Sequence, residues 1–140
     1  MKFGFDFHGV LNTHGKEYAE LTAALVEAGH EVHIVTGLQE TQELKDELAS
    51  YGIAWTRWFS IVDYHLELGE YEITWDDNQE PWMDAEAWNR SKADYCAREG
   101  LDFHLDDSPN YGSYFVGKTV FLLQKNPERQ AAWMRLAGRI

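Results

Sequence analysis

Five polar residues occur at positions where the sequence predicts the end of a buried segment or a neighbouring helix. Asp6 follows a short apolar run, and Thr36 ends a run of β-branched residues. Asp106 and Asp107 follow a third apolar run, and Lys92 lies in the helical segment before it. Carboxylate oxygens suit Mg²⁺, which commonly takes one or two carboxylates and fills its other positions with water and substrate phosphate. The five residues therefore predict phosphate chemistry assisted by a metal ion.

Each of these residues has a role that its side chain can perform. A carboxylate beside Mg²⁺ can attack phosphorus and form an aspartyl-phosphate, and Asp6 is the candidate nucleophile. Thr36, through its hydroxyl, and Lys92, through its ammonium group, would hold the phosphoryl oxygens and stabilise their charge. Asp106 and Asp107 would hold the metal. Without the cation, three carboxylates in one place would raise one another's pKa values, so the site requires the metal electrostatically as well.

The elements that must position these side chains alternate along the chain. The sequence predicts strands at 3–7, 31–36, 59–62, 101–105 and 119–123. It predicts helices at 16–28, from 37 to 51 and from 84 or 89 to 99, and a tail helix starting at 126–128. This alternation favours a parallel sheet, whose carboxyl edge brings distant residues together around a ligand. We therefore expect one Rossmann-like, three-layer α/β/α domain over residues 1–140.

Residues 53–88 form an aromatic and acidic insertion without a regular period, and residues 58–89 contain no Lys or Arg. We expect a hairpin or small insertion around residues 71–75, and a minimal cap or none. The Asp76-Asp77 pair is interpreted as a solvated turn and not as a second metal site. Aromatic side chains can stack on a nucleobase, but we interpret those of this region mainly as core residues. They are Trp55, Trp58, Tyr64, Tyr71, Trp75, Trp82 and Trp88.

The order of these motifs resembles that of the haloacid dehalogenase-like (HAD) superfamily over roughly residues 3–123. The matching segments, in family order, are Asp6-Phe7-His8-Gly9-Val10-Leu11, Ile34-Val35-Thr36-Gly37, Lys92 and Leu105-Asp106-Asp107-Ser108. The resemblance implies a HAD-type fold and an Mg²⁺-dependent phosphohydrolase that forms an aspartyl-phosphate on Asp6. It also implies that Thr36, Gly37 and Lys92 bind the phosphate. The implied Mg²⁺ ligands are Asp6, the backbone carbonyl of His8, Asp106 and Asp107.

His8 departs from the family pattern, because HAD phosphatases usually carry a second Asp there, which protonates the leaving oxygen and then activates water. An imidazole, with an ordinary pKa of about 6.5, can also transfer protons near neutral pH. We therefore interpret His8 as a candidate acid/base beside the other catalytic candidates. Two alternatives stay open. One is a phosphotransferase or phosphoanhydride-cleaving enzyme that needs no acid Asp, and the other is a catalytically weak binding module that uses residues 58–89 as its contact surface.

Other reactive side chains have simpler interpretations. Lys118 is a second candidate for the phosphate lysine, but it comes after the paired acids and not before them. Cys96, the single cysteine, is interpreted as a helix core residue and excludes an internal disulfide. The other histidines show no zinc-site spacing and are interpreted as surface or hydrogen-bonded core residues. They are His14, His30, His33, His65 and His104.

The composition limits the class of partner. The chain has 140 residues, 44% of them hydrophobic, and a net charge of −12 at pH 7. Because this charge repels long nucleic acids and anionic membranes, we expect a small phosphate ester of the nucleotide or sugar phosphate class as substrate. The sequence shows no apolar run long enough for a bilayer span and no secretory pattern. We therefore expect a cytoplasmic protein without a membrane partner, and we leave a homo-oligomer open.

Overall fold

A five-stranded parallel sheet forms the centre of the molecule in the computed structural model, which describes residues 1–125. The strand order is β3-β2-β1-β6-β7, and every neighbouring pair is parallel. The strands are β1 (Lys2–Phe5), β2 (Glu31–Thr36), β3 (Arg57–Ser60), β6 (Phe103–Asp106) and β7 (Val120–Leu123). The α/β class and the parallel sheet predicted from the sequence are thus confirmed. The predicted tail helix at 126–128 lies outside the described residues.

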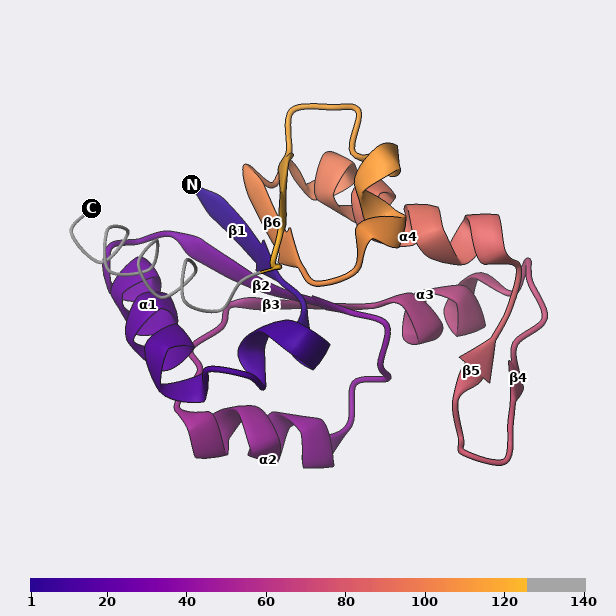
Figure 1. The fold of residues 1–140 in the computed structure, drawn as a ribbon, viewed down its shortest axis with the longest axis horizontal. Coiled ribbons are helices and arrows are strands. Elements are labelled where there is room, and N and C mark those ends of the chain that lie inside the picture. Colours follow the sequence, from indigo (N-terminus) through magenta and orange to yellow (C-terminus); the bar gives the residue numbers. More distant parts are fainter. Residues whose placement is uncertain (126–140) are drawn as a thin grey trace.

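Helices cover both faces of the sheet (Figure 1). They are α1 (Gly15–Glu27), α2 (Gln42–Tyr51), α3 (Ile61–Leu68) and α4 (Ala85–Glu99). The alternation of β2 separates two hydrophobic cores, since Ile34 packs with residues of α1 and α2 whereas Val35 packs with Tyr95 of α4. The three layers follow from this arrangement, which is compatible with a Rossmann-like fold.

Side-chain caps explain two of the predicted boundaries that differ from the structure. The second helix does not begin at Gly37 but at Gln42, because the hydroxyl of Thr41 accepts a hydrogen bond from the Leu44 N–H at 3.2 Å. The predicted strand at 59–62 ends at Ser60, whose hydroxyl accepts from the Asp63 N–H at 3.1 Å and begins α3. The apolar residues after Ser60 are therefore buried helix residues and not the end of a strand.

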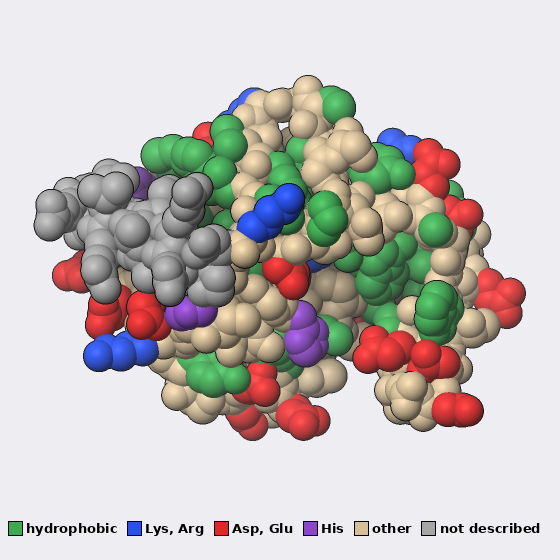
Figure 2. All heavy atoms as spheres, in the orientation of Figure 1, with side chains coloured by type: hydrophobic (Ala, Val, Ile, Leu, Met, Phe, Trp, Pro, Cys, Tyr) green, Lys and Arg blue, Asp and Glu red, His purple; other side chains and the backbone are tan. Residues whose placement is uncertain are grey.

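A two-stranded hairpin, β4 (Thr74–Trp75) and β5 (Pro81–Trp82), projects from the layered body between α3 and α4 (Figure 1). Asp76 closes its turn by accepting hydrogen bonds from the backbone N–H groups of Asn78 and Glu80, at 2.8 and 3.0 Å. This confirms the turn interpretation of the acidic pair. Figure 2 shows acidic and hydrophobic side chains gathered over this part of the surface.

The aromatic residues of the insertion are divided between core and surface. Trp55, Trp58 and Trp88 pack against the two cores, as expected. Trp75 and Trp82 contradict the core interpretation, because they remain 42% and 62% exposed on the hairpin. A two-stranded hairpin has too little area to bury both rings, which explains the difference. Among residues 1–125, no helix combines the length and apolar character needed to cross a bilayer.

Candidate active site

The carboxyl edge of the sheet brings together residues that are far apart in the sequence. Asp6 follows β1 directly, Thr36 ends β2, and Asp106 ends β6. Because β1 lies between β2 and β6, these three side chains are delivered to one edge. Phe5 pairs with Ile34, which places Thr36 one register step beyond Asp6 on the neighbouring strand.

Lys92 of α4 is the central charge of this cluster. Its Nζ lies 3.0 Å from Asp6 Oδ1 and 2.7 Å from Asp106 Oδ2, and its side chain is only 1% exposed. Burial by itself lowers the pKa of Lys92, but the two carboxylates outweigh it and raise the pKa above its ordinary value. The lysine therefore stays charged, and a negatively charged ligand at this edge would meet a permanent cation.

The two buried carboxylates have opposite electrostatic surroundings. Burial raises the pKa of Asp6, Lys92 opposes that increase, and the charge of Asp106 adds to it. Burial also acts to raise the pKa of Asp106, but the hydrogen bond from His104 and the charge of Lys92 lower it below the ordinary value. Asp106 therefore has the lower pKa of the two carboxyl groups. Asp6 has the higher pKa, because the charge of Lys92 does not offset the effect of burial.

Three carboxylates offer a site for a divalent cation. Asp6, Asp106 and Asp107 each present a ligand atom, and these atoms lie within 4.8 Å of one another. The donor set consists of hard oxygens, which suits Mg²⁺. Burial is the main reason that the pKa of Asp6 is raised and the charge of Asp106 adds to it, so a cation bound here would favour the ionised form of Asp6. The residues present therefore fit a bound Mg²⁺.

The backbone after β1 explains why glycine follows His8. Gly9 has a φ of +74°, a conformation that L side chains rarely adopt, and a Cβ there would collide with the carboxylate of Asp107. The turn segment Phe7–Leu11 therefore packs closely on the third acid. The Phe7 N–H also donates to Asp6 Oδ1 at 2.8 Å, which fixes the orientation of the candidate nucleophile.

Two of the three predicted phosphate-binding residues, Thr36 and Gly37, lie on β2 and in the loop that follows it. Thr36 is 1% exposed, and its hydroxyl accepts a hydrogen bond from the Leu38 N–H at 3.2 Å. A Cβ at Gly37 would lie 2.8 Å from Cζ2 of Trp88, so the loop and the indole pack too closely for a side chain there. Thr36 ends β2, as the sequence predicted, whereas Gly37 lies in the loop before α2 and not at the start of a helix.

His8 lies at the exposed rim and not in the buried cluster. Its Nδ1 is 3.5 Å from Asn12 Nδ2, and Asn12 Oδ1 accepts from the Gly9 N–H at 2.8 Å. Among the described residues, the group that could hold a cation consists of three carboxylates and does not include the imidazole of His8. The imidazole of His8 is therefore exposed and lies next to Asn12.

Sequence reasoning missed the part that two residues, His104 and Tyr111, play in supporting the cluster. His104 was interpreted only as a surface or hydrogen-bonded core residue; it is fully buried, and the partner that the sequence did not predict is Asp106, whose Oδ2 lies 2.9 Å from its Nε2. The Tyr111 ring lies 4.4 Å from Lys92 Nζ, and its hydroxyl accepts from Trp88 Nε1 at 3.2 Å. For His104 a signal existed, because residues two apart on a strand share a face. Nothing in the sequence singled out Tyr111.

Two other interpretations made from the sequence can be compared with the structure. Lys118 is exposed, and its Nζ lies 3.4 Å from Asp102 Oδ1. Lys92, and not Lys118, is therefore the lysine that contacts Asp106. Cys96 is a buried core residue of α4, as expected.

Comparisons with known proteins add no relative. No family model matches the chain, and no curated protein matches it.

Proposed function

We propose that the protein is a Mg²⁺-dependent phosphohydrolase of HAD type that cleaves a phosphate monoester through an aspartyl-phosphate on Asp6. The observation that carries this proposal is the buried cluster in which Lys92 joins Asp6 and Asp106, with Asp107 beside them. This cluster has the components that phosphoryl transfer needs, namely a fixed carboxylate, a permanent cation and a set of oxygen ligands. The HAD-like motif order gives the same assignment.

The chain's own residues divide the reaction into two steps. The Phe7 N–H and Lys92 hold Asp6 Oδ1, which leaves Oδ2 as the attacking oxygen. In the first step Asp6 forms a bond to phosphorus while the bond to the leaving oxygen breaks. In the second step water attacks the aspartyl-phosphate, releasing inorganic phosphate and restoring the carboxylate. Lys92, with Thr36 and the backbone of Gly37, would hold the phosphoryl oxygens during both steps.

The metal would be held by the side chains of Asp6, Asp106 and Asp107, and by the carbonyl of His8 if the HAD resemblance extends to that ligand. When bound, Mg²⁺ supplies positive charge that neutralises the acids and the developing phosphoryl charge. His104 keeps Asp106 in place for this role, since its Nε2 and Lys92 Nζ both contact Asp106 Oδ2.

Metal removal gives the first test. Purified protein is incubated with a panel of nucleotide and sugar phosphates in Mg²⁺ or in excess EDTA, and released inorganic phosphate is measured. We expect turnover of at least one ester in Mg²⁺ and a fall of about 10²-fold or more in EDTA, because three acids without a cation oppose a phosphate dianion. Turnover that is equal in EDTA and in Mg²⁺ would contradict the metal-dependent mechanism.

His8 at the rim favours a second candidate, phosphoryl transfer or phosphoanhydride cleavage, in which the leaving group needs no proton. The variant His8→Asn distinguishes the two. If His8 protonates the leaving oxygen, the variant should release phosphate about 10²-fold more slowly from an alkyl phosphate, but nearly as fast as wild type from p-nitrophenyl phosphate. Rates are measured on both substrates, with His14→Asn as the control for loss of an exposed imidazole. An equal loss on both substrates would exclude the acid role.

A further inference from the structure

A second pocket, of about 380 Å³, lies between α3 and α4, on the side of α4 that carries Ser91. Its size is within the range of small-molecule sites, about 300–1,000 Å³. The buried part of its lining consists of His65, Ala87 and Ser91, and these residues are each 5% exposed. None of the residues assigned to the candidate active site lines it.

His65, in the buried wall of this pocket, carries a ring nitrogen that receives no hydrogen bond in the described part of the chain. The Ser91 hydroxyl donates to the Ala87 carbonyl at 2.5 Å, so its oxygen accepts from His65 Nε2 at 2.7 Å. Nε2 therefore carries the ring proton, and burial lowers the pKa of His65, which keeps the ring neutral. Nδ1 is then an acceptor, and it is buried without a hydrogen-bond partner in the described part of the chain. This nitrogen has almost no accessible surface, so a ligand in the pocket meets the aromatic faces and the charged rim and not Nδ1.

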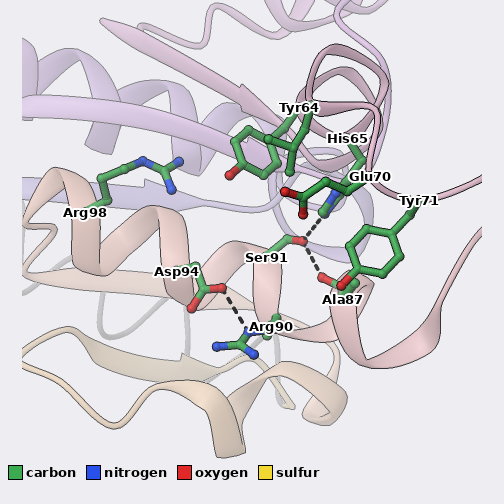
Figure 3. A pocket seen from close by; sticks show the side chains of 10 residues that line it. Tyr64, His65, Glu70, Tyr71, Ala87, Arg90, Ser91, Asp94 and Arg98 are labelled. Atoms are coloured by element: carbon green, nitrogen blue, oxygen red, sulfur yellow. Dashed lines mark hydrogen bonds and ion pairs between the residues drawn. The ribbon is translucent and has the colours of Figure 1, made fainter.

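The rim of the pocket presents one cation and one anion that do not neutralise each other. Arg90 is paired with Asp94, with 3.0 Å between Nε and Oδ2. Arg98 lies over the Tyr64 ring at 5.3 Å, and within residues 1–125 neither Arg98 nor Glu70 forms an ion pair. Figure 3 shows Arg98 and Glu70 on opposite sides of the pocket, with Ser91 between them.

We propose that this pocket binds a zwitterionic ligand of amino-acid or dipeptide type. Arg98 would hold the carboxylate and Glu70 the ammonium group. Tyr64 and Tyr71, which also line the pocket, offer aromatic surface for the hydrocarbon part. A phosphate or other simple anion would meet the carboxylates of Glu70 and Asp94, and a simple cation would meet Arg98. Only a ligand with both charges complements both ends.

The charge requirement can be tested with three closely related peptides. The ¹⁵N-labelled full chain is titrated with phenylalanyl-glycine, with its N-acetyl derivative and with its C-terminal amide, and amide chemical shifts are recorded. We expect the free dipeptide to shift residues of α3 and α4 saturably at millimolar concentration or below. Each capped derivative should bind about tenfold or more weakly, because it loses one charge-assisted contact. Equal affinity for all three peptides, or no shifts at millimolar dipeptide, would overturn the proposal.

Matched variants separate the pocket from general charge effects. Glu70→Gln and Arg98→Gln should each weaken dipeptide binding about tenfold or more, whereas the exposed controls Glu72→Gln and Arg57→Gln should bind as wild type does. Asp6→Asn, which removes the proposed nucleophile, should also bind normally, so failure of the phosphatase proposal does not affect this result. Loss of binding in the controls as well would assign the effect to surface charge and reject the pocket.

Discussion

Replacing Asp6 by Asn should abolish phosphate release, with a fall of at least about 10³-fold on any ester that the wild type hydrolyses. The amide has the size of the carboxylate but is not nucleophilic enough to attack phosphorus. The substitution also removes the charge of one of the three carboxylates whose ligand oxygens lie within 4.8 Å of one another. Initial rates of phosphate release in Mg²⁺, measured for both proteins on the same substrate, give the comparison.

The variant should remain folded, which makes the loss of activity interpretable. Asp6 is 7% exposed and burial raises its pKa, so its ionised form is costly in the folded state. An amide removes that cost, and we expect thermal unfolding at or above the wild-type temperature. Asp77→Asn is the matched control, because Asp77 is an exposed acid in the hairpin turn. If Asp6→Asn keeps more than about a tenth of wild-type turnover, the aspartyl-phosphate mechanism is wrong.

The parts of the fold that the sequence predicted are those set by local pattern. The β-branched run that ends at Thr36 is one of the buried strands, and acids at the ends of strands predicted the edge where they meet. Helix starts were predicted less well, because caps decide them. Thr41 and Ser60 each satisfy a backbone N–H with a hydroxyl, and this local hydrogen bond outweighs the apolar pattern around it.

The sequence predicted the charged residues of the candidate site but missed the residues that support them. Carboxylates and a lysine have few uses at a buried sheet edge, so their types indicated that they would lie together there. His104 and Tyr111 act through geometry that only folding supplies, since one lies 2.9 Å from Asp106 and the other places its ring 4.4 Å from Lys92. The pocket between α3 and α4 was missed for the same reason. His65 and Ser91 are 26 residues apart, and nothing in their spacing predicts the 2.7 Å contact.

Lys92→Met should impair both activity and stability, because the lysine is the cation that Asp6 and Asp106 share. Turnover is expected to fall about 10²- to 10³-fold, since the phosphoryl oxygens lose a fixed positive charge. Removing one partner of a buried ion pair typically destabilises a protein by about 3 to 5 kcal/mol, because it leaves an unpaired buried charge. Phosphate release and urea unfolding at neutral pH measure the two effects. Lys118→Met removes an exposed lysine and should change neither.

Mg²⁺ should reverse part of the stability loss in Lys92→Met, and this response separates an electrostatic role from simple packing. If the site binds Mg²⁺ as proposed, Lys92 and the cation would compete in the wild type for Asp6 and Asp106, whose oxygens lie 3.0 and 2.7 Å from Nζ. Without the lysine the acids bind the cation more tightly, so saturating Mg²⁺ should raise the unfolding temperature of the variant more than that of the wild type. A double variant, Lys92→Met with Asp106→Asn, should be more stable than Lys92→Met alone, because fewer buried charges remain unpaired. Equal Mg²⁺ responses in wild type and Lys92→Met would show that the lysine does not share its carboxylates with a metal.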